Sequence, residues 1–433
     1  MPPATPPPAG PRSHRPRLSP ARLPALARAA RMVVLGAACA LPGLRPALCD
    51  APAPGARPAP RLVAPRDAAA RAEAWRRHGG TPEALAAIGR GVDWLLRHQG
   101  EDGLWDADGF PSRCEPGGTA CTGTGRGQHG EDVPCPFDEP ISAMCCLALL
   151  GAGHLPGTDT PAARALERGL ARLASAAGPW GQPLALEALA EAEVLEARGR
   201  FTPAIARLCE ALLARRQPDG AWGYAAPMRR GSDVPTTALV VPALLAARDA
   251  GATLPDDLAP RVEAWLGTLE EEEGRLAYLL DGRAYGYTPT RDNAHAAVAL
   301  RELLEVGTAS SRHGSHLRLL HDRPPAWKVG FREMQVPGRG RVRVQVGHLS
   351  VYAWWYGTVG TFQRGGAAWT HWWAALRAAL LPAQEAQGCA RGSWPPEGTY
   401  ERQTGGRVMA TALALLALQA PLRHRRLVAS RAR

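Results

Sequence analysis

The sequence predicts an all-α fold, a single (α/α)6 toroid of six helical hairpins that follows a disordered N-terminal extension. From residue 67 onward, apolar residues recur every three or four positions, which is typical of helices rather than strands. The helical segments pair off, and a Gly-rich turn with an aromatic residue separates the two partners. We expect a closed ring, because a short open stack of hairpins needs polar capping repeats at both ends.

The first helix of each pair has one charged face and therefore suits an outer ring. These helices are expected at residues 82–98, 160–176, 201–215, 258–269, 312–322 and 367–381. The second helices, such as "VPTTALVVPALLAA", are more apolar and suit an inner ring. They are expected at residues 138–150, 183–197, 234–250, 291–306, 348–363 and 406–420.

A motif recurs in the turns between partner helices. "RRQPDGAWGY" contains Gln, Asp, Gly and Trp222, and "RHQGEDGLW" contains the same residue types at looser spacing. Gly permits the left-handed backbone that ends a helix, Asp accepts from free N–H groups, and Trp covers apolar surface on the neighbouring hairpin. We interpret the motif as a structural clasp. Trp105 ends the second of these sequences, and the other turns carry Trp180, Tyr285, Tyr287, Trp327 and Trp394.

The net charge of +11 is concentrated at the two ends of the chain. Residues 1–66 carry ten Arg and one acidic residue, and residues 423–433 carry five Arg and no acidic residue, so the middle holds 39 acidic against 36 basic residues. The expected toroid, residues 67–422, is nearly neutral, which argues against a nucleic-acid partner. A single Lys among abundant Arg, Ala, Gly and Pro is typical of a GC-rich, bacterial genome.

The N-terminal extension has the layout of an export signal. An Arg-bearing lead precedes the apolar run Met32–Leu44, and small residues follow before Asp50. The run is shorter than the roughly 20 apolar residues that cross a bilayer, so no stable membrane span is expected. We expect export to the periplasm or cell envelope. The alternative is a cytoplasmic protein with a disordered extension, in which Met32 is the true start.

The clasp sequence at 217–222 and its looser copy at 99–105 resemble the repeat of the squalene-hopene cyclase and protein prenyltransferase β-subunit superfamily. "HLSVYAWWYGTVGTFQRGG" and "GGRVMATALALLAL" are similar to helices of bacterial squalene-cyclase-like repeat proteins. The resemblance covers about residues 80–420 and implies an α/α toroid, the terpenoid cyclase fold. It does not extend to the catalytic motifs. The Asp-rich D-x-D-D motif of the cyclases, the Asp/Cys/His zinc set of the prenyltransferases and the thioester motif of complement-type toroids are all missing from the sequence.

Polar residues gather where the inner helices begin. The positive ends of the helix dipoles favour anionic groups there, so a ligand or catalytic site is expected at this end of the ring. The candidates are Asp138, Glu139, Glu187, Asp233, Arg291, Asp292, His295, His348 and Arg407. The alternative is that Asp138, Asp233 and Asp292 are helix caps or first-turn acids.

Among these residues we assign a candidate catalytic set. Asp292 and His295 have an i, i+3 spacing and therefore share one helix face, where a carboxylate can orient an imidazole that acts as a base. His348 and Asp233 complete the set. An aromatic helix, "YAWWYGTVGTF", supplies candidate lumen-binding residues, Tyr352, Trp355 and Tyr356, together with Arg291 and Arg407, although the aromatic residues also suit ordinary core packing.

The loop "CEPGGTACTGTGRGQHGEDVPC" contains Cys114, Cys121, His129 and Cys135. In an exported protein, a disulfide between two of these three cysteines is expected. A Cys3His zinc site is the alternative, but the spacings match no standard zinc finger. We therefore expect no metal and no cofactor, and we interpret Cys145, Cys146 and Cys209 as buried core residues.

The segment "VGFREMQVPGRGRVRVQVGH" departs from the helical pattern. Val342, Val344 and Val346 alternate with polar residues, which favours one arm of a short hairpin that turns at residues 337–340. Such a hairpin would form a basic flap for an anionic ligand, and a solvated loop is the alternative.

Together these features predict an exported binding or interaction module. Its partner would be an apolar small molecule or a peptide segment held in the lumen. The competing prediction is an isoprenoid cyclase or transferase with a non-standard acid in place of D-x-D-D.

Overall fold

The chain divides into two compact units, Met1–Pro46 and Ala47–Arg433. A computed structural model describes residues 59–125, 135–224, 231–271, 274–278, 292–328, 330–336 and 340–427, all of which belong to the second unit. The predicted export signal and Arg291 lie outside these residues.

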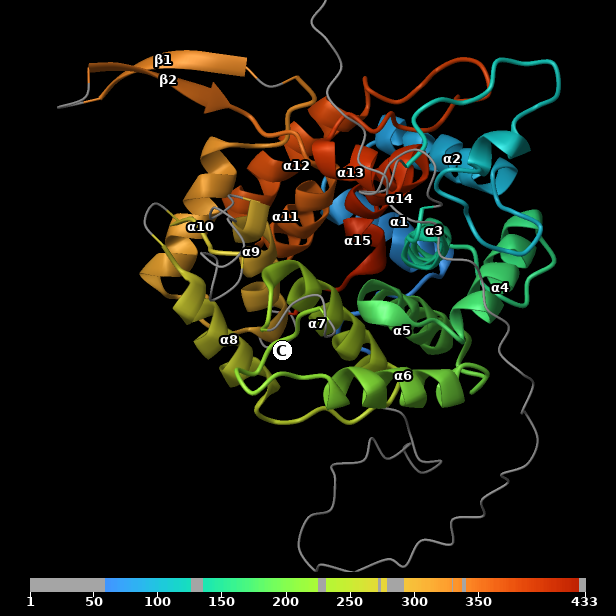
Figure 1. Cartoon of the computed structure of the whole chain (residues 1–433), viewed down its shortest axis with the longest axis horizontal. Coiled ribbons are helices and arrows are strands. Elements are labelled where there is room, and N and C mark those ends of the chain that lie inside the picture. Colours follow the sequence, from blue (N-terminus) through green and yellow to red (C-terminus); the bar gives the residue numbers. More distant parts are fainter. Residues whose placement is uncertain are drawn as a thin grey trace, which may run out of the picture. The chain divides into compact units, whose positions relative to one another are not determined.

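Six inner helices follow one another around a ring, and the last of them returns to contact the first (Figure 1). They are α3 (Asp138–Ala152), α5 (Gly178–Glu196), α7 (Val234–Asp249), α9 (Asp292–Leu304), α11 (Val351–Arg364) and α14 (Gly406–Leu418). The outer ring consists of α2 (Pro82–Arg97), α4 (Pro161–Leu173), α6 (Thr202–Ala214), α8 (Leu258–Leu269), α10 (Ser311–Asp322) and α12 (Gly366–Leu380). The predicted (α/α)6 toroid is therefore confirmed.

Four short elements complete the helical part: α1 (Ala68–Arg77), the 3-10 turn η1 (Phe110–Arg113), α13 (Thr399–Gln403) and α15 (Ala420–Arg423). The two rings differ as their sequences require. All thirteen residues of α14 are buried, whereas α4 buries one face and exposes the other. Side-chain caps begin several helices, for example Thr81 on α2 and Thr160 on α4, each of which accepts a backbone N–H of the first turn.

The clasps join the two helices of one hairpin. The indole of Trp222 donates to the Leu212 carbonyl at the end of α6, and its backbone N–H donates to Thr237 of α7. These hydrogen bonds lie within one hairpin. The rings of the equivalent Trp105 and Trp394 also lie against Gly169 of α4 and Gly91 of α2 in the neighbouring hairpins, as the clasp interpretation expects. Glutamine adds polar contacts to the neighbour: Gln99 donates to the Ala165 carbonyl of α4, and Gln384 to the Ala87 carbonyl of α2.

The segment that departs from the helical pattern forms two antiparallel strands, β1 (Gly330–Val336) and β2 (Gly340–Val346). Gly330 lies opposite Val346 and Val336 opposite Gly340, so the hairpin turns where the sequence predicts. The pair projects from the ring beside α10 and α12 (Figure 1).

The ends of the toroid differ from the expected boundaries at residues 66 and 423. Leu62, Val63 and Arg66 are buried, and so are residues 423 and 424 beyond the expected end. Val63 pairs with His424 in an antiparallel bridge, and the Ala64 N–H donates to the Arg423 carbonyl at 2.9 Å. The start and the end of the toroid therefore meet where the inner helices end.

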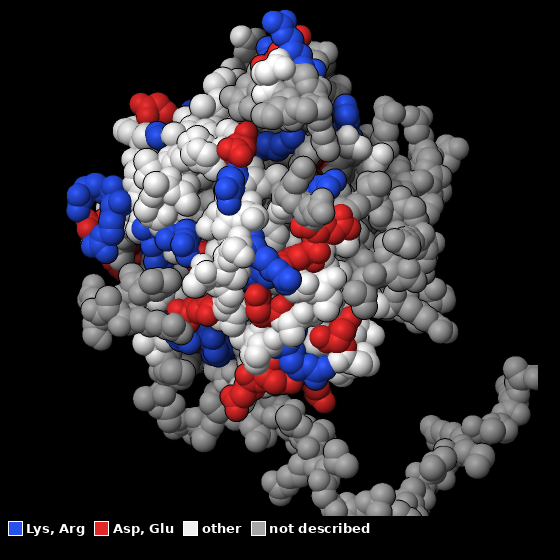
Figure 2. Space-filling model, turned by 90° about the vertical axis from the view of Figure 1, so that its left-hand side faces the viewer, with Lys and Arg blue, Asp and Glu red and all other residues white. Residues whose placement is uncertain are grey.

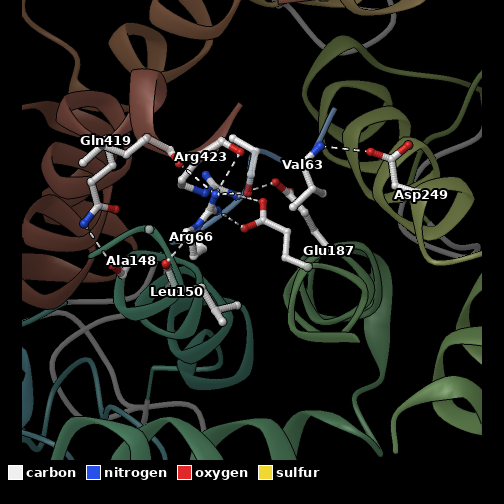
Figure 3. Close-up of polar contacts among 12 residues, drawn as sticks. Val63, Arg66, Ala148, Leu150, Glu187, Asp249, Gln419 and Arg423 are labelled. Atoms are coloured by element: carbon white, nitrogen blue, oxygen red, sulfur yellow. Dashed lines mark hydrogen bonds and ion pairs between the residues drawn. The ribbon is translucent and has the colours of Figure 1, made fainter. Parts of the chain in front are cut away.

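Buried ion pairs hold this junction (Figure 3). Arg423 donates to Glu187 at 2.9 Å and to Glu191 at 2.5 Å, and Arg66 lies 3.4 Å from Glu191. Arg66 also donates to the Leu150 carbonyl at the end of α3. Arginines suit this position because the C-terminal ends of helices carry partial negative charge and unpaired carbonyls. From the Arg-rich composition alone, Arg66 was expected in the disordered extension and Arg423 in the basic C-terminal tail.

Charges on the outer surface are mixed. The face over α8 and α10 carries basic and acidic residues side by side (Figure 2), which agrees with the near-neutral charge of the toroid. Within the described part of the chain, no helix is both long and apolar enough to cross a membrane.

Candidate functional site

Partly exposed aromatic residues line the end of the ring at which the inner helices begin. Phe137 stacks on Trp180 with ring centroids 4.8 Å apart, and Trp180 meets the edge of Tyr224 at 5.6 Å. On the other side of the mouth, Tyr352 contacts Tyr400 at 4.5 Å. Trp180, which the sequence pattern placed in a clasp, thus belongs to the first turn of α5 and faces these rings.

The lumen below this mouth is filled by side chains. Phe137, Trp180, Tyr352 and Tyr400 share a cavity of about 20 Å³. A second cavity of about 10 Å³ lies deeper, beside Glu187, Trp355 and Tyr356. Each has room for about one water molecule. The described part of the lumen therefore has no room for a ligand larger than a water molecule.

Asp138 and Glu139 begin α3 directly after Phe137, and both are half-buried. Asp138 accepts the Ala107 N–H at 2.9 Å, and Glu139 accepts the Ala177 N–H at 3.2 Å. Burial raises the pKa of Asp138 to about 6, assisted by the negative charges of Asp106 and Asp108. This carboxyl group is therefore protonated in a substantial fraction of molecules near pH 6.

Asp292, His295 and His348 come together at the start of α9, as the candidate catalytic set requires. His348 Nε2 lies 2.8 Å from Asp292 Oδ1, and the His295 and His348 rings stack at 5.1 Å. Burial alone would raise the pKa of Asp292, but the hydrogen bond and positive charge of His348 outweigh it and lower that pKa. The Asp292 side chain is 47% exposed, so an ionised carboxylate is accessible here.

Asp233, the fourth member of the candidate catalytic set, lies directly before α7. It is buried, caps α7, and accepts the backbone N–H of Thr236 at 2.8 Å and its hydroxyl at 3.0 Å. The helix-cap alternative therefore describes its contacts. Glu401 has a related role, because it accepts the Tyr352 N–H at the start of α11 at 2.8 Å. Burial raises the pKa of Glu401.

The predicted lumen-binding residues are divided between the mouth and the core. Tyr352 is partly exposed at the mouth, and its hydroxyl lies 3.1 Å from that of Tyr356. Trp355 and Tyr356 are buried, which matches the core-packing alternative. Arg407 is also buried and donates to the Thr122 carbonyl and to Ser393, so it fastens a loop and is not free to bind a ligand.

The predicted disulfide is absent from the described residues, because Cys114, Cys121 and Cys135 are all free thiols. Cys114 and Cys121 lie together, but with His98 and Cys389 rather than with Cys135. The Cys135 thiol donates to the Thr404 carbonyl instead. His129, which the zinc alternative used, lies outside the described residues.

Sequence reasoning missed several of these residues. In the sequence, Phe137 and Tyr400 have no adjacent aromatic residues. Only closure of the ring brings them to the same cavity. Asp138 could be found because two acids precede an apolar run, but burial sets its pKa. His98 and Cys389 are 291 residues apart, and no local spacing connects them.

No protein-family model and no curated protein matches this sequence. Several solved structures resemble its fold. One is an inactive variant of the α-1,6-mannanase GH76A of Salegentibacter sp. HEL1_6 in complex with α-1,6-mannotriose, with a TM-score of 0.51 and 9% identity over 78% of this chain and 99% of that one. The mannanase alone gives a TM-score of 0.51 with 10% identity, over 78% of this chain and 98% of that one. At such identities the likeness establishes the fold.

These findings correct the family resemblance and the function that it implied. The similar structures are toroidal mannanases, so the assignment to squalene cyclases and prenyltransferases is wrong. An apolar or peptide partner in the lumen is also wrong. The mannanase variant binds an oligosaccharide, and the cavities of about 20 Å³ and about 10 Å³ are too small for either partner. The two functions predicted from the sequence, a binding module and an isoprenoid cyclase, are wrong for the same reasons.

Proposed function

We propose that this protein is a glycoside hydrolase that acts on an uncharged glycan at the mouth of the toroid. The observation that carries the proposal is the position of Asp138, whose pKa is raised to about 6, beside Glu139 and directly after the stacked Phe137–Trp180 pair. Glycoside hydrolysis generally needs two carboxyl groups, one of them with a raised pKa. The fold is one on which toroidal mannanases are built.

The charges at the mouth favour a neutral sugar. Its described ionisable residues include the acids Asp138, Glu139 and Asp292, whereas the buried Arg407 is committed to loop contacts. A phosphate or uronate would meet negative charge there. A neutral sugar instead presents hydroxyl groups to the carboxylates and an apolar ring face to aromatic side chains such as Trp180.

In this proposal Asp138 donates its proton to the glycosidic oxygen as the bond to the anomeric carbon breaks. Glu139 provides the second carboxylate, and a water molecule supplies the hydroxyl group that ends on the anomeric carbon and the proton that returns to the acid. Activity should fall as the pH rises above about 6, because Asp138 then loses the proton that it must donate.

The experiment is hydrolysis of a panel of neutral oligosaccharides that includes α-1,6-linked mannotriose, with products separated by chromatography. Asp138→Asn and Glu139→Gln should each lower kcat by about 100-fold or more. Asp256→Asn is the matched control, because this exposed acid lies in the linker before α8 and should keep full activity. Cleavage that survives Asp138→Asn would show that the acid is wrong, and failure to cleave any glycan would refute the hydrolase.

Asp292 is a second candidate for the reacting carboxylate, because its side chain is exposed and ionised and contacts His348. The same panel separates the two centres. If Asp292→Asn abolishes cleavage while Asp138→Asn leaves it intact, the reacting carboxylate belongs to α9 rather than α3.

We also infer export, from the Arg-bearing lead and the apolar run Met32–Leu44. The measurement is the mass of the mature chain recovered from the cell envelope of an expressing bacterium. A full-length chain that is confined to the cytoplasm would overturn this inference.

A further inference from the structure

One histidine and three cysteines meet at the seam between the first and last hairpins. His98 follows α2, Cys114 and Cys121 lie in the loop after η1, and Cys389 lies between α12 and α13. His98 Nε2 is 3.7, 3.6 and 3.5 Å from the sulfur atoms of Cys114, Cys121 and Cys389, respectively. All four atoms lie within 4.8 Å of one another.

These distances match the edges of a tetrahedron around zinc. Bonds of about 2.3 Å to sulfur and about 2.05 Å to nitrogen, at tetrahedral angles, place nitrogen and sulfur about 3.6 Å apart. The three nitrogen–sulfur distances, 3.5 to 3.7 Å, agree with this value. A disulfide would consume two of the thiols and leave the third beside the imidazole.

The surroundings prepare the histidine to be a ligand. Its Nδ1 lies 2.9 Å from the Trp94 carbonyl oxygen, and only a protonated nitrogen donates to a carbonyl, so Nε2 holds the free lone pair. Its ring stacks on Trp94 at 4.3 Å, which fixes its orientation. The Cys121 N–H donates to the Cys114 sulfur at 3.2 Å, as the neighbours of metal-bound thiolates often do.

We propose that His98, Cys114, Cys121 and Cys389 bind one zinc ion. Four protein ligands leave no open position, and His98, Cys121 and Cys389 are each less than 9% exposed, so the site is structural rather than catalytic. The ion joins the two hairpins that the chain does not connect directly. It fastens the end of α2 to the turn after α12 across 291 residues.

The test uses the full chain, purified under reducing conditions, exposed to zinc and desalted, with bound metal measured by elemental mass spectrometry. About one zinc ion per chain is expected for the wild type, and Cys389→Ser and Cys121→Ser should lose it. Cys135→Ser is the matched control: it lies in the same stretch of chain and bonds to the Thr404 carbonyl, so it should keep the ion.

A second measurement guards against variants that fail to fold. Removal of the ion from the wild type by a chelator should lower its thermal midpoint, and zinc should restore it. Cobalt bound in its place should give the visible absorption of a tetrahedral thiolate site. The proposal is overturned if the wild type retains no zinc, if Cys389→Ser retains as much as the wild type, or if the folded chain contains a disulfide between Cys114 and Cys121.

Discussion

The indole N–H of Trp222 donates to the carbonyl oxygen of Leu212 at 2.7 Å, across the turn between α6 and α7. The same bond joins Trp105 to Leu95 and Trp394 to Leu380, at 2.8 Å in each case. These three clasps are equivalent because a Trp ten or fourteen residues after the acceptor folds back over the end of its own outer helix. Each adds a second donor to a carbonyl in the last turn, which otherwise accepts only the backbone N–H three residues later.

Trp222→Ala should lower the free energy of unfolding by about 3–5 kcal/mol, because it removes a fully buried aromatic side chain. Trp222→Phe keeps most of the apolar contact but removes the indole hydrogen bond to the Leu212 carbonyl, so its cost should be about 1–2 kcal/mol. Urea unfolding followed by circular dichroism measures both. A Trp222→Phe variant as stable as the wild type would contradict a role for the hydrogen bond.

Arg66→Met should cost about 3–5 kcal/mol, because it removes a cation from a buried ion-pair network and leaves Glu191 with Arg423 alone. Arg61→Met is the matched control. Arg61 also forms an ion pair, with Glu305, but its side chain is 46% exposed, so the loss should be below about 1 kcal/mol. Similar losses for both variants in the same denaturation assay would contradict the buried role of Arg66.

Two glycines in helices should respond to alanine with opposite sign. A Cβ at Gly360 of α11 would lie 2.7 Å from Val298 and 2.8 Å from the backbone of Ala299, so Gly360→Ala should push α9 and α11 apart and destabilise by about 1–3 kcal/mol. Gly89 of α2 has open space at the same position, and Gly89→Ala should stabilise by about 0.5–1 kcal/mol. Thermal unfolding of both variants gives the two signs, and destabilisation by Gly89→Ala would refute the second.

Glu187 makes stability depend on pH. Burial raises its pKa to about 7 despite the nearby Arg423, so the folded state holds this proton more tightly than the unfolded state. Its contribution is present below the unfolded pKa of about 4.5 and is lost as the pH rises toward 7. Glu187→Gln cannot titrate, so relative to wild type it should gain up to about 3 kcal/mol between pH 5 and pH 8.

The control for this measurement is Glu210→Gln, which changes an exposed carboxylate on α6 in the same way. Its urea midpoints at pH 5 and pH 8 should follow those of the wild type. If Glu187→Gln also follows the wild type at both pH values, Glu187 does not titrate in this range.

Local patterns predicted most of the fold. The period of apolar residues located all twelve helices of the two rings, and the Trp222 and Trp105 turns revealed the repeat. The pair Asp292 and His295 could be predicted because they lie three positions apart on one helix. The contact between Asp292 and His348 depends on how α9 packs against the chain before α11, and no local pattern encodes that packing.

Other features depend on contacts between distant parts of the chain. His98 and Cys389 are 291 residues apart, so the cysteine spacing in the loop suggested the wrong partners. Arg66 and Arg423 belong to Arg-rich stretches, and only the buried Glu187 and Glu191 reveal their role. Sequence reasoning named Asp138 among the candidates at the start of the inner helices, but it could not show the raised pKa that distinguishes this residue, because that pKa depends on burial.

The pairing of Val63 with His424 places the start of the toroid against its end, so a chain emerging from the ribosome cannot complete either part alone. Until α14 and the segment after it have been synthesised, the apolar faces of α3 and α11 that α14 will cover have no partner. We therefore expect this ring to complete its folding only after synthesis. The nascent chain should depend on chaperones for longer than an open solenoid of the same length, whose repeats can fold one after another.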